Sequence, residues 1–114
     1  MSAIMLSAKP IQSQAKGEIF QKEGSLVAAG SIDFIIPDSV EKMGVQVVPS
    51  GGASATVYAT ENSVESVNAG TASFLVWDNG TVTSLSQALC SGVATVIRIT
   101  QSGTGSVKYA ICAK

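Results

Sequence analysis

The sequence predicts an all-β protein, an antiparallel β-sandwich or jelly roll of about seven to eight strands with an extended N-terminal arm. Between Met43 and Ile111 the chain is a series of short β-branched segments in which apolar and polar residues alternate. Gly, Ser, Asn and Thr separate these segments at roughly 10-residue intervals, and no long amphipathic helical pattern interrupts them. We therefore predict an arm at residues 1–16 and a single β-sandwich domain at residues 17–114.

The N-terminal arm shows neither a helical nor a strand period, yet it carries apolar side chains with little fold of their own to cover them. We expect five of its residues to bind a partner: Ile4, Met5, Leu6, Pro10 and Ile11. An unstructured terminus without a role is the alternative. The segment has no basic region before its apolar residues, so it does not resemble a secretory signal, and we expect synthesis and folding in a cytoplasm.

The first part of the domain contains strand segments separated by turn residues. Residues 18–22 alternate, and residues 23–25, Glu-Gly-Ser, are predicted to form a turn before the apolar residues 26–29. Residues 31–36 form the next predicted strand. Pro37 ends this strand because proline has no backbone donor and biases the preceding residue toward an extended conformation.

Two further predicted strands, residues 43–48 and 53–60, flank the strongest loop of the chain at residues 49–52. The second of these strands has one face of small residues, which suggests the close approach of another sheet or subunit. The residues that share a face in these two strands are Met43, Val45 and Val47 in the first, and Ala55, Val57 and Ala59 in the second.

Residues 61–71 fit either a short helical turn with Val64 and Val67 facing inward or a loop. Further along the chain, Asn79-Gly80 is predicted to be the tip of a β-hairpin, because both residues tolerate the positive φ of a type I′ turn. This local prediction is the most specific one that the turn chemistry allows.

The last part of the chain is predicted to end in a second hairpin. Residues 84–90 fit either the end of a strand or one helical turn. Residues 93–100 and 106–112 then alternate, and residues 102–105, Ser-Gly-Thr-Gly, are predicted to close the hairpin between them. The final segment places three side chains on one face: Val107, Tyr109 and Ile111.

The composition argues against several classes of partner and cofactor. Seven Lys or Arg and eight Asp or Glu give a net charge of −1 without a basic cluster, so we expect no nucleic-acid partner. No apolar run is long enough for a membrane helix. Cys90 and Cys112 match no metal motif, and the chain has no histidine, so we expect no metal and no cofactor. Reduced, buried thiols are favoured over a disulfide.

Catalysis is not expected from these residues. A histidine base is absent, and the carboxylates are scattered singly over predicted turns and strand ends. Asp33 alternates with apolar neighbours and is predicted to be an outward polar position facing solvent or an interface. Trp77 is a possible surface aromatic that could stack on a sugar ring. Residues 74–77 are apolar on both faces, however, and favour a strand covered on both sides, with another subunit as a candidate cover for one of them.

Four segments of the chain resemble short virion proteins of tailed bacteriophages. They lie at residues 47–60, 69–72, 77–82 and 91–99, and a Gly-Thr-Gly loop and a last strand follow them. The likeness covers about residues 44–114.

The resemblance implies a capsid decoration, or cement, protein: a small β-sandwich or jelly roll that binds across capsomers as a dimer or trimer. Its partners would be the major capsid protein and other copies of itself, on the capsid surface of a virion assembled in the host cytoplasm. The arm would then lie over a neighbouring subunit or the major capsid protein. Two other classes remain open: a fibre, tail or carbohydrate-binding module that uses Trp77, and a hydrolase with an unnoticed pair of carboxylates.

Overall fold

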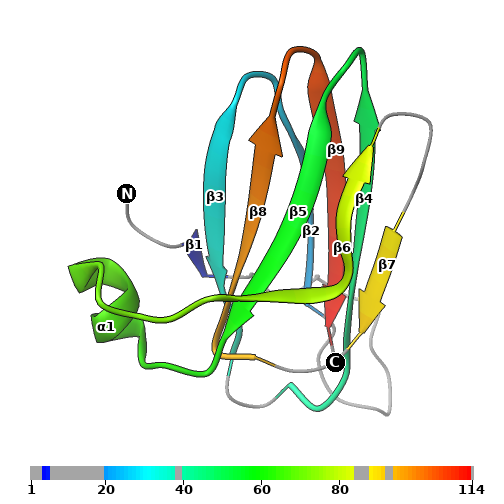
Figure 1. The fold of residues 1–114 in the computed structure, drawn as a ribbon. Helices are drawn as coiled ribbons and strands as arrows, with labels where there is room; N and C mark the ends of the chain where they lie inside the picture. Colours follow the sequence, from blue (N-terminus) through cyan, green and yellow to red (C-terminus); the bar gives the residue numbers. More distant parts are fainter. Residues whose placement is uncertain (1–3, 6–19, 38–39, 84–87, 92–93, 114) are drawn as a thin grey trace, which may run out of the picture.

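The computed structural model describes residues 4–5, 20–37, 40–83, 88–91 and 94–113, and these residues form two β-sheets that face each other (Figure 1). One short helix, α1 (Val64–Ala69), lies beside the sheets. The strands are β1 (Ile4–Met5), β2 (Phe20–Leu26), β3 (Gly30–Ile35), β4 (Met43–Ser50), β5 (Ser54–Thr60), β6 (Leu75–Thr83), β7 (Ala88–Ser91), β8 (Val96–Ser102) and β9 (Ser106–Ala113).

The strand order is that of a jelly roll. One sheet has the order β1-β3-β8-β5-β6 and the other has the order β2-β9-β4-β7. The antiparallel pairs are nested, because β2 pairs with β9, β3 with β8, β4 with β7, and β5 with β6. The chain therefore folds back on itself once and the resulting ribbon rolls up into two sheets. This order confirms the predicted fold class and distinguishes a jelly roll from the immunoglobulin-like order.

The core lies between the sheets and is built by the alternation that the sequence predicted. The predicted inward faces of β4 and β9 are confirmed, and Ala55 and Val57 of β5 are buried against them. The rings of Phe34 and Tyr109 meet with their centroids 5.3 Å apart. The largest fully buried apolar side chains are Phe34, Ile97, Ile99, Ile111, Val45, Val47, Val96 and Val107.

The predicted turn at residues 23–25 is wrong, because β2 runs straight through it and pairs with β9. Gly24 has a packing role instead. A Cβ at this position would lie 2.5 Å from Tyr109 Oη and 2.8 Å from its Cζ, so only glycine leaves room for the ring. Burial under this strand raises the pKa of the Tyr109 hydroxyl.

The predicted hairpin at Asn79-Gly80 is also wrong, because β6 is one strand that continues through these residues. In its register with β5, Val76 pairs with Tyr58 and Thr81 pairs with Thr56. Residues 77–80 therefore oppose a single residue of β5 and form a large bulge. Figure 1 shows the result: β6 first crosses in front of β5 and then bends sharply to run along it. The glycine and asparagine serve a bend within a strand rather than a chain reversal.

The predicted hairpin at residues 102–105 is a connection between sheets. β8 pairs with β3 and β5, whereas β9 pairs with β2 and β4. Gly103 and Gly105 both have positive φ. A Cβ on Gly103 would lie 2.6 Å from the carbonyl oxygen of Gly52, so this turn packs backbone to backbone against the turn after β4. Local turn chemistry located the turn correctly but assigned the wrong partners to its strands.

Two segments had alternative predicted conformations, residues 61–71 and residues 84–90. The helical alternative for residues 61–71 is confirmed by α1, in which Val67 is buried and Val64 is half-buried. Ser63 caps the start of this helix by accepting a hydrogen bond from the Ser66 amide. In the predicted segment 84–90, β7 begins at Ala88, and residues 84–87 lie outside the described residues.

The two cysteines lie on strands that flank β4. Cys112 pairs with Gly44 from one side, and Cys90 pairs with Val45 from the other. Two strand spacings are about 9.5 Å, which exceeds the Cα separation of about 7 Å that a disulfide can span. The prediction of a buried thiol is wrong for Cys112, which is free and exposed on the outer face of its sheet.

Candidate functional site

The described part of the N-terminal arm adds a strand to the five-stranded sheet. Ile4 pairs with Phe34 and Met5 pairs with Ile35 in parallel orientation, so β1 covers the edge of β3. Three further residues of the predicted partner-binding set lie outside the described residues: Leu6, Pro10 and Ile11. The structure thus shows where the arm attaches to the domain.

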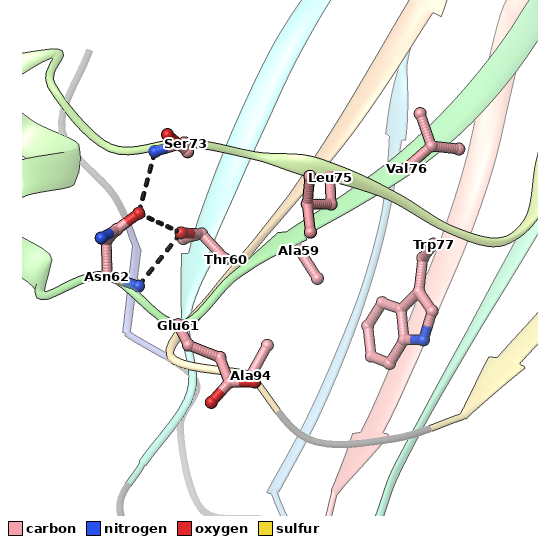
Figure 2. Close-up of a pocket in the computed structure, with 9 residues that line it drawn as sticks. All are labelled: Ala59, Thr60, Glu61, Asn62, Ser73, Leu75, Val76, Trp77 and Ala94. Carbon is pink, nitrogen blue, oxygen red and sulfur yellow. Dashed lines mark hydrogen bonds between the residues drawn. The ribbon is translucent and has the colours of Figure 1, made fainter.

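A pocket of about 510 Å³ lies at the opposite edge of the same sheet, where β5 ends and β6 begins (Figure 2). β5 and the turn after it supply one side, the start of β6 supplies the other, and the segment before β8 supplies the base. The pocket is lined by Ala59, Thr60, Glu61, Asn62, Ser73, Leu75, Val76, Trp77 and Ala94.

The apolar wall of the pocket comes from the first residues of β6. Leu75 pairs with Ala59, which packs against the core, so the two residues share the core-facing side of the sheet. Leu75 is nevertheless 73% exposed, and its neighbour Val76 is 55% exposed. Described residues of this chain leave Leu75 and Val76 largely uncovered at this end of the sandwich, and cover of one face by another subunit stays a prediction.

Trp77 lies between the core and the pocket, and its stacking on a sugar stays a prediction. Its ring is half-buried and packs against the core, and it also lines the pocket. In Figure 2 the indole projects from β6 toward the side of the strand on which Ala94 lies. Trp77 is the only tryptophan in the chain, so its fluorescence reports directly on this pocket.

The polar rim of the pocket is held by a compact set of hydrogen bonds around Asn62. The Thr60 hydroxyl donates to the side-chain oxygen Oδ1 of Asn62 over 3.0 Å, and the backbone N–H of Asn62 donates to the Thr60 hydroxyl over 3.1 Å. The backbone N–H of Ser73 donates to Asn62 Oδ1 over 2.9 Å (Figure 2). These bonds tie the end of β5 to the segment that precedes β6. Glu61 is exposed next to Asn62 at this rim.

A second polar cluster lies on the outer face of the sheet, beside α1. Asp33 pairs with Arg98 in the β3–β8 register, and its carboxylate accepts two hydrogen bonds from the guanidinium, 2.7 Å from Nε and 2.9 Å from Nη2. Arg98 also lies over the ring of Phe74, 3.9 Å from the ring centroid. The hydrogen bonds to Asp33 raise the pKa of the Arg98 guanidinium.

This cluster corrects the prediction for Asp33. The residue does point outward from the sheet, but it is only 5% exposed because Arg98 covers it. A small hollow of about 270 Å³ lies between the ion pair and the C-terminal half of α1. The Asp33 carboxylate and the Arg98 guanidinium neutralise each other through two hydrogen bonds. This ion pair therefore stabilises the fold and leaves no net charge to bind a ligand.

The described part of the chain brings together no metal-binding cluster and contains no membrane-spanning helix. There, no three residues among Asp, Glu and Cys come close enough together to hold a metal ion. No described helix is long and apolar enough to cross a membrane.

The described residues define a jelly-roll β-sandwich with a pocket at one sheet edge and an attached N-terminal strand at the other. No protein-family model matches the chain, and no curated protein is significantly similar to it.

Two solved structures are similar in outline. One is from work on Bacillus endospore appendages, a family of disulfide-linked pili, with 16% identity, a TM-score of 0.43 and coverage of 93% of this chain and 98% of that one. The other is Aeromonas hydrophila PliG, a periplasmic inhibitor of g-type lysozyme, with 15% identity, a TM-score of 0.42 and coverage of 99% and 96%. Likeness at this level carries no argument about function.

Proposed function

We propose that this protein is a non-enzymatic structural component of a bacteriophage virion, which decorates the capsid and stabilises it by binding the major capsid protein. The resemblance of residues 44–114 to phage virion proteins is one support for the proposal. The jelly-roll architecture is a second, because viral capsid domains use this fold among others. Fold alone does not define function, so the proposal depends on the surfaces that the domain offers for adhesion.

The observation that carries the proposal is the attachment of β1 to the edge of β3. This pairing fixes the point on the domain from which the arm acts, which lowers the ordering cost that a contact with another chain must overcome. Each isoleucine or leucine of the arm that a partner buries would contribute about 1.5 to 3 kcal/mol. Modest contacts of this kind suffice when many copies bind one shell.

Contacts between copies have support in the exposed apolar side chains. Val27 is 79% exposed at the end of β2, and Leu75 and Val76 are exposed at the start of β6. Leu75 and Val76 point to opposite sides of β6, because neighbouring residues of a strand alternate, and both line the pocket described above. We propose a dimer or trimer on the capsid surface, with the arm and Val27 at its contacts.

The test is co-sedimentation of the purified protein with capsids assembled from the phage's major capsid protein alone. We expect the wild-type protein to move with the capsids in a density gradient. The double variant Ile4→Asp/Ile11→Asp should lose at least tenfold in affinity, because two buried apolar contacts are each worth about a factor of ten or more. Lys42→Asp, which changes an exposed loop residue, is the control for charge.

Failure of the wild-type protein to sediment with the capsids would contradict the proposal. So would equal binding by the arm variant and the control. In either case the other class considered from the sequence, a fibre, tail or carbohydrate-binding module, would be favoured. The aromatic pocket at β6 is compatible with either class.

A further inference from the structure

We propose that the pocket between β5 and β6 binds the neutral pyranose ring of a glycan, with Trp77 against the apolar face of the sugar and Glu61 as an acceptor for its hydroxyl groups. This inference goes beyond capsid decoration, since it assigns a ligand to a site that adhesion through the arm does not use. It follows from the shape, the chemistry and the charge of the pocket.

The shape and the apolar lining fit a small organic ligand. Pockets for such ligands are typically about 300 to 1,000 Å³ and combine apolar walls with a few placed polar groups. The volume of about 510 Å³ falls within this range. Trp77 and Leu75 form the apolar wall, and Ala59 and Ala94 leave space beside them because their side chains are small. An aromatic ring with an apolar face matches the C–H face of a pyranose.

The polar groups lie at the rim, where the hydroxyls of a sugar would point. A carboxylate can only accept hydrogen bonds, and Glu61 therefore suits hydroxyl donors. The Ser73 hydroxyl can donate or accept on the facing side of the rim. The bonds from Thr60 and Ser73 to Asn62 fix both sides of the rim in advance. Such preorganisation reduces the entropy that a ligand must overcome on binding.

The charge of the pocket selects against acidic sugars. Among the described residues that line the pocket there is neither lysine nor arginine, whereas Glu61 is one of them. A sugar carboxylate would meet a like charge without a compensating cation, and such pairs are unfavourable. A cationic ligand gains little in turn, because one exposed carboxylate contributes only about 0 to 1 kcal/mol to an ion pair. A neutral sugar is the remaining match to an aromatic wall with a carboxylate at its rim.

The position of the pocket leaves it accessible during adhesion through the arm. β1 and β6 are the two outer strands of the same five-stranded sheet, so the attachment edge and the pocket edge lie at opposite ends of that sheet. In Figure 1 β1 lies at one side of the sheet, whereas β6 begins in front of the sheet and then bends to run along its other side. Binding of a glycan and binding of a capsid can therefore be measured separately, and failure of one does not decide the other.

The experiment combines a glycan array with tryptophan fluorescence of the full chain. The array carries neutral oligosaccharides of glucose, galactose, mannose and N-acetylglucosamine beside sialylated and uronic-acid oligosaccharides. We expect binding to a subset of the neutral probes and none to the acidic probes. Titration with a bound neutral oligosaccharide should shift or quench the emission of Trp77, since no other tryptophan contributes.

Three variants separate stacking, hydrogen bonding and nonspecific effects. Trp77→Ala should lower array binding at least tenfold, and Trp77→Phe should restore part of it because the ring face remains. Glu61→Gln should weaken binding severalfold and relax the rejection of acidic sugars. Glu41→Gln makes the same change as Glu61→Gln at an exposed loop position outside the pocket lining, and should bind as the wild type does. If Trp77→Ala fails to fold, Trp77→Phe and Glu61→Gln still test the site.

Two outcomes would overturn the proposal. One is the absence of any neutral glycan that changes the Trp77 emission, even if an apolar dye does, because the pocket would then accept apolar groups only. The other is glycan binding that Glu61→Gln and the Trp77 variants leave unchanged, because the sugar would then bind elsewhere.

Discussion

At the scale of single residues, the pairing of Asp33 with Arg98 is the clearest case of a contact that specifies the fold. The two residues are 65 positions apart in sequence but directly opposite each other in the β3–β8 register. A one-residue slip of this register would move every side chain of the strand to the other face of the sheet and leave a buried carboxylate without its partner. Phe74 adds a ring contact that holds the guanidinium over the carboxylate.

Replacing Arg98 with methionine should lower the free energy of unfolding by about 2 kcal/mol. The loss arises mainly because Asp33 remains buried without its hydrogen bonds, and it is moderated because the Arg98 side chain is 33% exposed. Denaturant unfolding followed by circular dichroism gives the measurement. Asp33→Leu/Arg98→Met, which removes both charges, is the matched control and should unfold within about 1 kcal/mol of the wild type. Equal stability of the single variant and the wild type would contradict this account.

At the scale of elements, the sheet edges are each protected in a different way. β1 covers the edge of β3, the bulge at residues 77–80 bends β6, and β7 is only four residues long. β2 carries Lys22, which pairs with the buried Ile111 and so lies on the core-facing side of the edge. An inward-pointing charge at an edge strand opposes pairing with another chain. These devices favour contacts through side chains over the addition of strands.

Lys22→Val should therefore promote self-association of the protein. The change removes the charge that blocks the β2 edge and adds an apolar side chain on its core-facing side. Light scattering coupled to size-exclusion chromatography should show larger species whose share grows with concentration. Lys108→Val, which removes the same charge from an exposed position on the interior strand β9, should leave the size distribution as in the wild type. An unchanged distribution for Lys22→Val would refute the role assigned to this lysine.

At the scale of the whole molecule, the jelly roll depends on pairings between distant parts of the chain. Among strands β2 to β9, only β5 and β6 are both consecutive in sequence and adjacent in a sheet. β2, near the start of the domain, pairs with β9 at its end. Loops of this length must close before the pairings stabilise the fold, and such topologies fold slowly.

We expect refolding on a scale of milliseconds to seconds, as for other sandwiches of high contact order. Stopped-flow dilution from denaturant, followed by Trp77 fluorescence, measures the rate. Ile99→Val removes one buried methylene group and leaves every loop length unchanged, so it should change the refolding rate only modestly. Complete refolding within about a millisecond would show that local contacts dominate the folding barrier.

The sequence predicted the fold class and most strand positions, because alternation of apolar residues is a local signal. It did not predict strand partners, and the two errors at Asn79-Gly80 and residues 102–105 share this cause. At residues 102–105 the turn was located correctly, but it connects two sheets. At Asn79-Gly80 there is no turn, because residues that favour a hairpin also occur in a bulge within one strand. Gly24 was wrongly predicted to lie in a turn, because the Tyr109 ring that requires a glycine at this position lies on another strand.

The candidate site was only partly predictable. Trp77 was identified from the sequence as a possible surface aromatic, and the structure places it in the wall of a pocket. Glu61, Asn62 and Ser73 were not identified, because they line the same pocket as Trp77 only through the register of β5 with β6 and the bonds around Asn62. Exposure of Leu75 also depends on the bend of β6, which no local pattern encodes.

The antiparallel register of β2 with β9 has a mechanical consequence. Phe20 begins one strand and pairs with Ala113 at the end of the other, so the two points lie side by side. Tension applied between them would pull β2 from β9 one residue pair at a time, which requires little force at any moment. Tension applied along the strands from opposite ends of the sandwich must instead shear many hydrogen bonds together. Partners that load this domain mechanically should therefore bind its faces and side edges. Force applied between Phe20 and Ala113 would separate β2 from β9 most easily.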